Sequence, residues 1–256
     1  RLGALDEKTL ATAVTNADRA VRVHVMRVLS ESSLVPGILS ESPRRLALAA
    51  LNDPDPYVQR AAVDALGQHQ QNTGGGNFEI IDRLLDLRRK VPAADSQLLH
   101  VCRMALRDHL QMPGAFAHVA ALKLDEADAK AVAEIALGAP TDESAAFLLS
   151  HVQKFSEPRD RLTAYLRHTA RYAPAAQLDH LAGFVQQRFG DDLDLQFTLF
   201  KSVQAGLAQR DGKVTAGLRA WGAELVEKLL APVDESSIPW ISTPLKDTPT
   251  GSPWIL

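Results

Sequence analysis

The sequence predicts an all-α protein in which pairs of helices stack one after another along the chain. The stretch LNDPDPYVQRAAVDALG (residues 51–67) recurs in altered form both before and after its own position. Ala and Leu are abundant and aromatic residues make up only 5% of the chain, a composition that suits closely packed helices better than sheets. No segment alternates polar and apolar residues over a useful strand length. We therefore expect roughly six stacked helix pairs.

The repeat is visible when residues 51–66 are compared with their neighbours in sequence. Shifted back by 37 positions, the stretch aligns Val58 with Val21. Shifted forward by 40 positions, it aligns Ala62 with Cys102. Three units with a spacing near 40 are typical of a stacked helical repeat, in which each unit buries its apolar side against the next.

Each unit is expected to hold two helices with a tight break before the second. In the best-formed unit, Pro54 and Pro56 end the first helix, because proline lacks an N–H and restricts the residue before it. Asp55 is placed to cap the second helix, with Pro56 at its first position. Apolar residues then recur every three or four positions. The residues of this repeat signature are Pro54, Asp55, Pro56, Val58, Ala62 and Leu66.

Beyond residue 110 the helical periodicity continues, and proline or glycine marks most of the breaks. The expected helices cover residues 113–123, 125–137, 142–154, 159–172, 175–189, 192–209 and 213–230. With the earlier units this makes twelve to thirteen helices. We expect residues 1–230 to form one helical repeat domain. Residues 231–256 hold five prolines and two tryptophans and are expected to be an extended tail or a linker to a further domain.

The net charge, the cysteine content and the hydropathy of the chain disfavour several classes of protein. The net charge is −3, with 28 basic and 31 acidic residues, whereas a surface that binds duplex nucleic acid usually has a basic excess. The single cysteine, Cys102, excludes an internal disulfide. No apolar run approaches the ~20 residues that span a bilayer. Because the chain starts at Arg1, we interpret it as part of a longer protein.

Few side chains suggest chemistry. His100 and Met104 are residue types that ligate haem iron, but there is no Cys-x-x-Cys-His motif, and we expect Cys102 to pack in the core. The acids of residues 191–194 are better explained as a helix cap than as a calcium loop. The glycine-rich residues 71–77 lack the features of a phosphate loop and are interpreted as an insertion between helices. We therefore expect no catalytic residue, no metal ligand and no cofactor.

Arginines are the one class of side chain that suggests a binding surface, because they make the first half of the chain mildly basic. A solenoid that repeats one residue per unit builds a ladder along one face, although no pure ladder forms here. A solvated face is the simpler interpretation. The alternative is a face for an anionic partner, for which the candidates are Arg22, Arg60 and Arg103.

The stretch DPDPYVQRAAVDALG resembles the second helix of a HEAT repeat, with its Asp-Pro, its Val-Arg-like pair and its Ala-Ala-x-x-Ala-Leu-Gly. The resemblance implies a right-handed α-α superhelix of the armadillo-like type. The tail motif Ser252-Pro253-Trp254 and the opening LGALDEKTL are further similar to the helical region of large planctomycete-type proteins. In those proteins HEAT repeats are joined to a dehydrogenase-like propeller and a c-type haem module.

That second resemblance implies an exported parent protein, in the periplasm or at the cell surface; without it, a cytoplasmic location is expected. Any redox or haem activity would belong to domains outside this chain, and no catalytic or haem residue is carried over. We expect a non-catalytic scaffold that mediates protein–protein interaction or spaces domains, with a protein or a neighbouring domain as its partner. The alternatives are a HEAT-fold enzyme of the DNA glycosylase or bilin lyase type, and a nucleic-acid binder.

Overall fold

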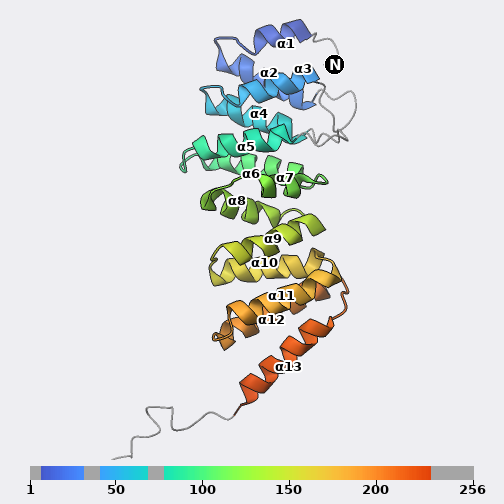
Figure 1. Cartoon of the computed structure of the whole chain (residues 1–256). Coiled ribbons are helices and arrows are strands. Elements are labelled where there is room, and N and C mark those ends of the chain that lie inside the picture. Colours follow the sequence, from blue (N-terminus) through green and yellow to red (C-terminus); the bar gives the residue numbers. More distant parts are fainter. Residues whose placement is uncertain (1–6, 32–40, 69–77, 232–256) are drawn as a thin grey trace, which may run out of the picture.

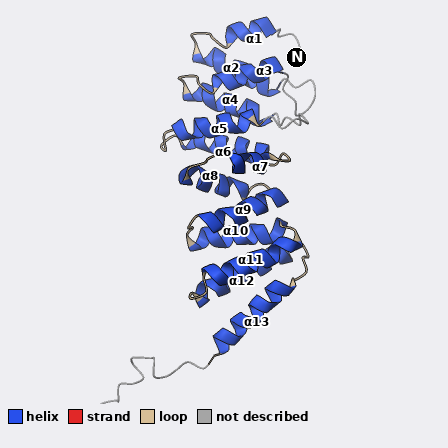
Figure 2. Cartoon of the chain, viewed as in Figure 1, coloured by secondary structure: helices blue, strands red, loops and turns tan. Residues whose placement is uncertain are grey.

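The computed structural model describes residues 7–31, 41–68 and 78–231. Over these residues the protein is entirely helical, without a strand (Figure 2). The glycine-rich residues 71–77 and residues 232–256 of the expected tail lie outside the described residues. The thirteen described helices are α1 (Glu7–Ala13), α2 (Arg19–Glu31), α3 (Glu41–Ala50), α4 (Pro56–Gln68), α5 (Glu79–Lys90), α6 (Ser96–Leu110), α7 (Ala115–Ala121), α8 (Glu126–Ala136), α9 (Asp142–Lys154), α10 (Arg159–Tyr172), α11 (Ala175–Arg188), α12 (Leu193–Ala208) and α13 (Ala216–Leu230).

The sequence-based helix ranges beyond residue 110 are confirmed, and those predicted for α9 and α10 coincide with the observed bounds. Helix α7 is the shortest of the seven and is shorter than predicted. Gly114 precedes it with a φ of 80°, a left-handed conformation that favours glycine and stops the helix from starting earlier. Leu122 follows it in an extended conformation. Only two turns of helix fit between these residues.

The helices follow one another in chain order along an elongated stack, with α1 at one end and α13 at the other (Figure 1). Among the even-numbered helices, α2 packs on α4, α4 on α6, α6 on α8, and α10 on α12. Among the odd-numbered helices, α1 packs on α3, α7 on α9, α9 on α11, and α11 on α13. Most consecutive helices also contact each other, so the stack has two layers and its contacts are mostly between helices close together in the chain.

One apolar core runs through the stack from Leu10 to Leu225. Several turns between helices are closed by a side chain that accepts the N–H three residues further on, which satisfies a backbone donor at the helix start. The capping residues of this kind are Asp95, Asp125, Thr141, Asp192 and Thr215. Within the described residues, none of the helices combines the length and the apolar character that crossing a bilayer requires.

Candidate functional site

The repeat-signature residues all lie at one turn and one interface. Asp55 accepts the N–H of Tyr57 at 2.8 Å, and Pro56 is the first residue of α4. Val58, Ala62 and Leu66 have no exposed surface. The signature therefore describes how α4 begins and how it is buried, and it contributes no group that faces a ligand.

Arg22 and Arg60 each reach forward to an acid of the next unit. The guanidinium of Arg22 donates to both carboxylate oxygens of Asp53, at 2.8 and 3.1 Å. Arg60 donates to Asp95 at 2.7 Å and to Gln97 at 2.7 Å. In both cases an arginine on a second helix is joined to the turn that precedes the next second helix. These bonds fix the position of one unit relative to the next.

The pKa values of Asp53 and Asp95 are both lowered, as expected for carboxylates that accept hydrogen bonds. Burial opposes the ionisation of Asp53, but hydrogen bonds from Arg22 and from the N–H of Asp55 outweigh it and lower its pKa. The pKa of Asp95 is lowered chiefly by the N–H of Leu98, with Arg60 adding to the effect. Both acids are therefore charged at neutral pH, and each balances its arginine.

Arg103 donates to Glu134 at 3.2 Å, a bond between α6 and α8. Glu134 also pairs with Arg161 at 2.8 Å. All three arginines proposed for an anionic partner thus have a carboxylate partner within the chain. A partner that bound them would have to compete with these acids, and such a face stays a prediction.

The other residue types singled out in the sequence lie in ordinary structural positions. Cys102 is buried in the core as predicted, and burial raises its pKa to about 12. His100 and Met104 are exposed, Met104 with 43% of its surface accessible. Asp192 caps α12 by accepting the N–H of Leu195. In the described part of the chain, no three His, Cys, Asp or Glu side chains gather as metal ligands would.

A serine and a histidine meet in the core, but their roles are structural. Ser144 Oγ lies 2.6 Å from the carbonyl of Ala139 and 2.7 Å from that of Thr141, and 2.8 Å from His168 Nε2. Carbonyl oxygens only accept, so the hydroxyl proton points to them and His168 Nε2–H donates to Oγ. A histidine that donates to a serine does not activate it as a base would. The contact ties α9 to α10.

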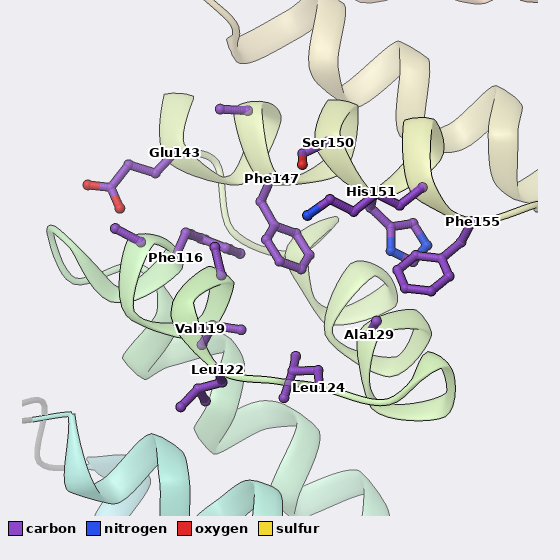
Figure 3. A pocket seen from close by; sticks show the side chains of 14 residues that line it. Phe116, Val119, Leu122, Leu124, Ala129, Glu143, Phe147, Ser150, His151 and Phe155 are labelled. Atoms are coloured by element: carbon purple, nitrogen blue, oxygen red, sulfur yellow. The ribbon is translucent and has the colours of Figure 1, made fainter. Parts of the chain in front are cut away.

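An apolar pocket of about 480 Å³ lies between α7, α8 and α9. Figure 3 shows the side chains of Phe147 and His151 on α9 and of Phe155 just after it, with Leu122 and Leu124 on the opposite side. The pocket exists because α7 is short: its two turns do not cover the full length of α9. The lining residues are Phe116, Ala117, Val119, Ala120, Leu122, Leu124, Ala129, Glu143, Ala146, Phe147, Ser150, His151, Lys154 and Phe155.

At one end of this pocket lies a buried histidine–glutamate pair. His151 Nε2 donates to Glu157 Oε1 at 2.6 Å, and only 1% and 4% of the two side chains are exposed. The imidazole is surrounded by the rings of Phe147, Phe155 and Tyr165. Its Nδ1 is buried and has no hydrogen-bond partner in the described structure. A polar atom without a partner in an apolar setting is costly, and such atoms are uncommon in native structures.

Sequence reasoning did not find this pocket. Phe147 and His151 are spaced by four residues, which places them on one face of α9, and Phe155 directly follows the helix. That spacing is the only signal in the sequence, and it is also what a core-facing stripe looks like. The opposite wall depends on where α7 ends, which the sequence did not fix. Comparisons with protein-family models, with curated proteins and with solved structures find no match for this chain.

Proposed function

We propose that this chain is a non-catalytic, HEAT-like α-solenoid that holds a partner protein or sets the distance between domains. The observation that carries this proposal is the forward pairing of arginine and carboxylate between successive units. Arg22 with Asp53 and Arg60 with Asp95 repeat the same connection one unit apart. Such bonds between successive units are suited to keeping the parts of the stack at a defined separation.

The packing supports the same conclusion. Helices contact mainly their neighbours in the sequence, so the stability of such a stack is approximately a sum of units and junctions. An elongated stack also exposes far more surface than a compact domain of the same length, and repeat proteins use that surface for binding. The right-handed superhelix and the HEAT type belong to this proposal, as does the exported multidomain parent that the planctomycete-type resemblance implies.

The proposal is tested by measuring the distance between spin labels at the two ends of the stack. Ala11→Cys on α1 and Ala223→Cys on α13 place labels at exposed positions. Native Cys102 is buried with a raised pKa and is not expected to take a label. We expect a single, narrow distance distribution in double electron–electron resonance that does not change between low and high salt.

A second labelled pair provides the reference width. Ala49→Cys and Gln68→Cys are exposed positions on the adjacent helices α3 and α4. If the end-to-end distribution is several times broader than this local one, the stack does not act as a rigid scaffold. Such a result would refute the proposed function whatever the local helix packing.

A further inference from the structure

We propose that the pocket between α7, α8 and α9 binds an elongated apolar molecule that ends in a carboxylate, as a fatty acid does. The proposal goes beyond the scaffold function, which needs no small molecule. It rests on three properties of the pocket: its length, its apolar lining and the position of its one open cation.

The length follows from the lining residues of α9. Glu143, Phe147, Ser150 and Lys154 recur every three or four residues and therefore lie on one face of the helix. Glu143 and Lys154 are 154 − 143 = 11 residues apart, which corresponds to about 16 Å along a helix. The cavity is thus a groove along α9, with a volume of about 480 Å³ in the range of small-molecule sites.

The lining between the two ends is apolar. Phe116 and Val119 of α7 are buried, and Leu122 and Leu124 of the following segment are half-buried. Phe116 packs against Phe147 with ring centroids 5.4 Å apart. Because the chain is poor in aromatic residues, with only 8 Phe, three of them at one groove form a local concentration of apolar surface suited to a hydrocarbon chain.

The charges distinguish the two ends of the groove. At one end, both carboxylate oxygens of Glu143 already accept the N–H of Gly114, at 2.9 and 3.1 Å. At the other end, Glu157 accepts from His151. Lys154 is exposed and forms no ion pair with any described residue. The groove therefore has one free cation, at the His151 end, and a carboxylate placed there would find an unpaired ammonium.

The size of the groove suits a small molecule, because about 480 Å³ is typical of small-molecule sites. Glu143 at the opposite end is an acid, so a ligand carboxylate is favoured at the Lys154 end and the hydrocarbon chain lies along the apolar lining.

Calorimetric titration of the whole chain with dodecanoate and with dodecanol tests the proposal. We expect dodecanoate to bind saturably at one site, more tightly than dodecanol. Ala120→Trp should lower the affinity for both at least about tenfold, because Ala120 lines the groove and is exposed. Ala121→Trp is the matched control: Ala121 is exposed on the same helix and is not among the lining residues, so its affinity should stay within about twofold.

Lys154→Gln separates the head group from the chain and leaves the core untouched. We expect it to lower the affinity for dodecanoate about fivefold, the equivalent of one exposed ion pair, without changing that for dodecanol. Lys213→Gln, a remote exposed lysine, should change neither. No saturable binding, an equal loss with Ala120→Trp and Ala121→Trp, or an equal loss of both probes with Lys154→Gln would overturn the proposal. None of these outcomes bears on the spin-label distances, so the scaffold function is judged separately.

Discussion

The first six helices and the last seven are held together in different ways. From α1 to α6, successive units are joined by arginine–carboxylate pairs near the surface, and the interfaces are closed by small residues such as Ala47, Ala62 and Ala65. From α7 onward, surface pairs such as Arg159–Asp194 and Arg161–Glu134 continue, but buried polar pairs and aromatic rings also enter the junctions. We refer to these as the front region and the rear region of the stack.

The aromatic and buried polar contacts of the rear region are clearest at α13. Trp221 is fully buried on α13, where its ring meets Phe200 edge-on with centroids 5.0 Å apart. Its Nε1–H donates to Gln196 at 3.2 Å, and Gln196 in turn donates to the carbonyls of Phe189 and Gly190. Here a large aromatic side chain and a buried amide join the helices, in addition to buried alanines such as Ala170 and Ala182.

The difference explains why the repeat fades along the sequence. Small residues at fixed positions leave a recognisable pattern, because only Ala or Gly allows helices to approach so closely. The rear region also buries alanines, among them Ala133, Ala145 and Ala170, but its aromatic and buried polar contacts are specific to each junction and leave no common pattern. The pocket lies where the two regions meet, at the short helix α7, and it is a consequence of that irregularity.

The comparison predicts that the rear region is more sensitive to loss of a single polar partner. Glu157→Ala removes the acceptor of His151 and leaves a buried imidazole without any partner. We expect the free energy of unfolding, measured by urea titration, to fall by about 3 kcal/mol or more. The double variant Glu157→Ala/His151→Leu should recover part of this loss. If the single variant costs less than about 1 kcal/mol, the pair does not stabilise the rear region.

A pH effect of similar size is expected at His168. Burial lowers its pKa to about 4, so the folded state resists the proton that the unfolded chain binds at its ordinary pKa near 6.5. The stabilisation is complete above pH 6.5 and is lost as the pH falls toward 4, by up to about 3 kcal/mol. His168→Gln should flatten this part of the urea-measured pH profile. An unchanged slope would show that the loss has another origin.

In the front region the sensitive feature is volume. Ala62 has no exposed surface at the interface of α4, so Ala62→Phe overpacks it and should lower the free energy of unfolding by roughly 1–3 kcal/mol. Ala49→Phe, at an exposed position of α3, is the matched control and should stay within about 0.5 kcal/mol. If the two variants have equal unfolding midpoints, Ala62 is not at a tightly packed interface, which contradicts the position that the repeat alignment gives it.

The sequence predicted the helices better than the site. Proline, glycine and capping residues mark the breaks locally, and for that reason α9 and α10 were predicted at their observed bounds. The burial of Cys102 followed from its alignment with Ala62. These predictions depend only on periodicity and on residues close together in the chain.

The pairs and the pocket depend on distances across the stack, which a single sequence does not specify. Arg22 was assigned to a face for an anionic partner, but its partner Asp53 is 31 residues away and becomes visible only when the units are stacked. The spacing of Phe147 and His151 gives a face of α9 without showing which residues lie opposite it. The missing information is the length of α7, set by the conformations of Gly114 and Leu122.

The smallest expected effects concern the arginine–carboxylate pairs. We expect the loss in free energy of unfolding to be larger for a buried pair than for an exposed one. Arg22 is 14% exposed and Asp53 10%, and Arg22 also donates to the carbonyls of Asn16 and Ala17, so Arg22→Ala should cost about 1–2 kcal/mol. Arg103 is 52% exposed, and its truncation should cost less than about 0.5 kcal/mol, because solvent screens an exposed pair. Urea unfolding at low and high salt measures both losses. If Arg103→Ala and Arg22→Ala lower the free energy of unfolding equally, the burial of a pair does not determine its contribution. The front region would then be stabilised by the number of its surface ion pairs.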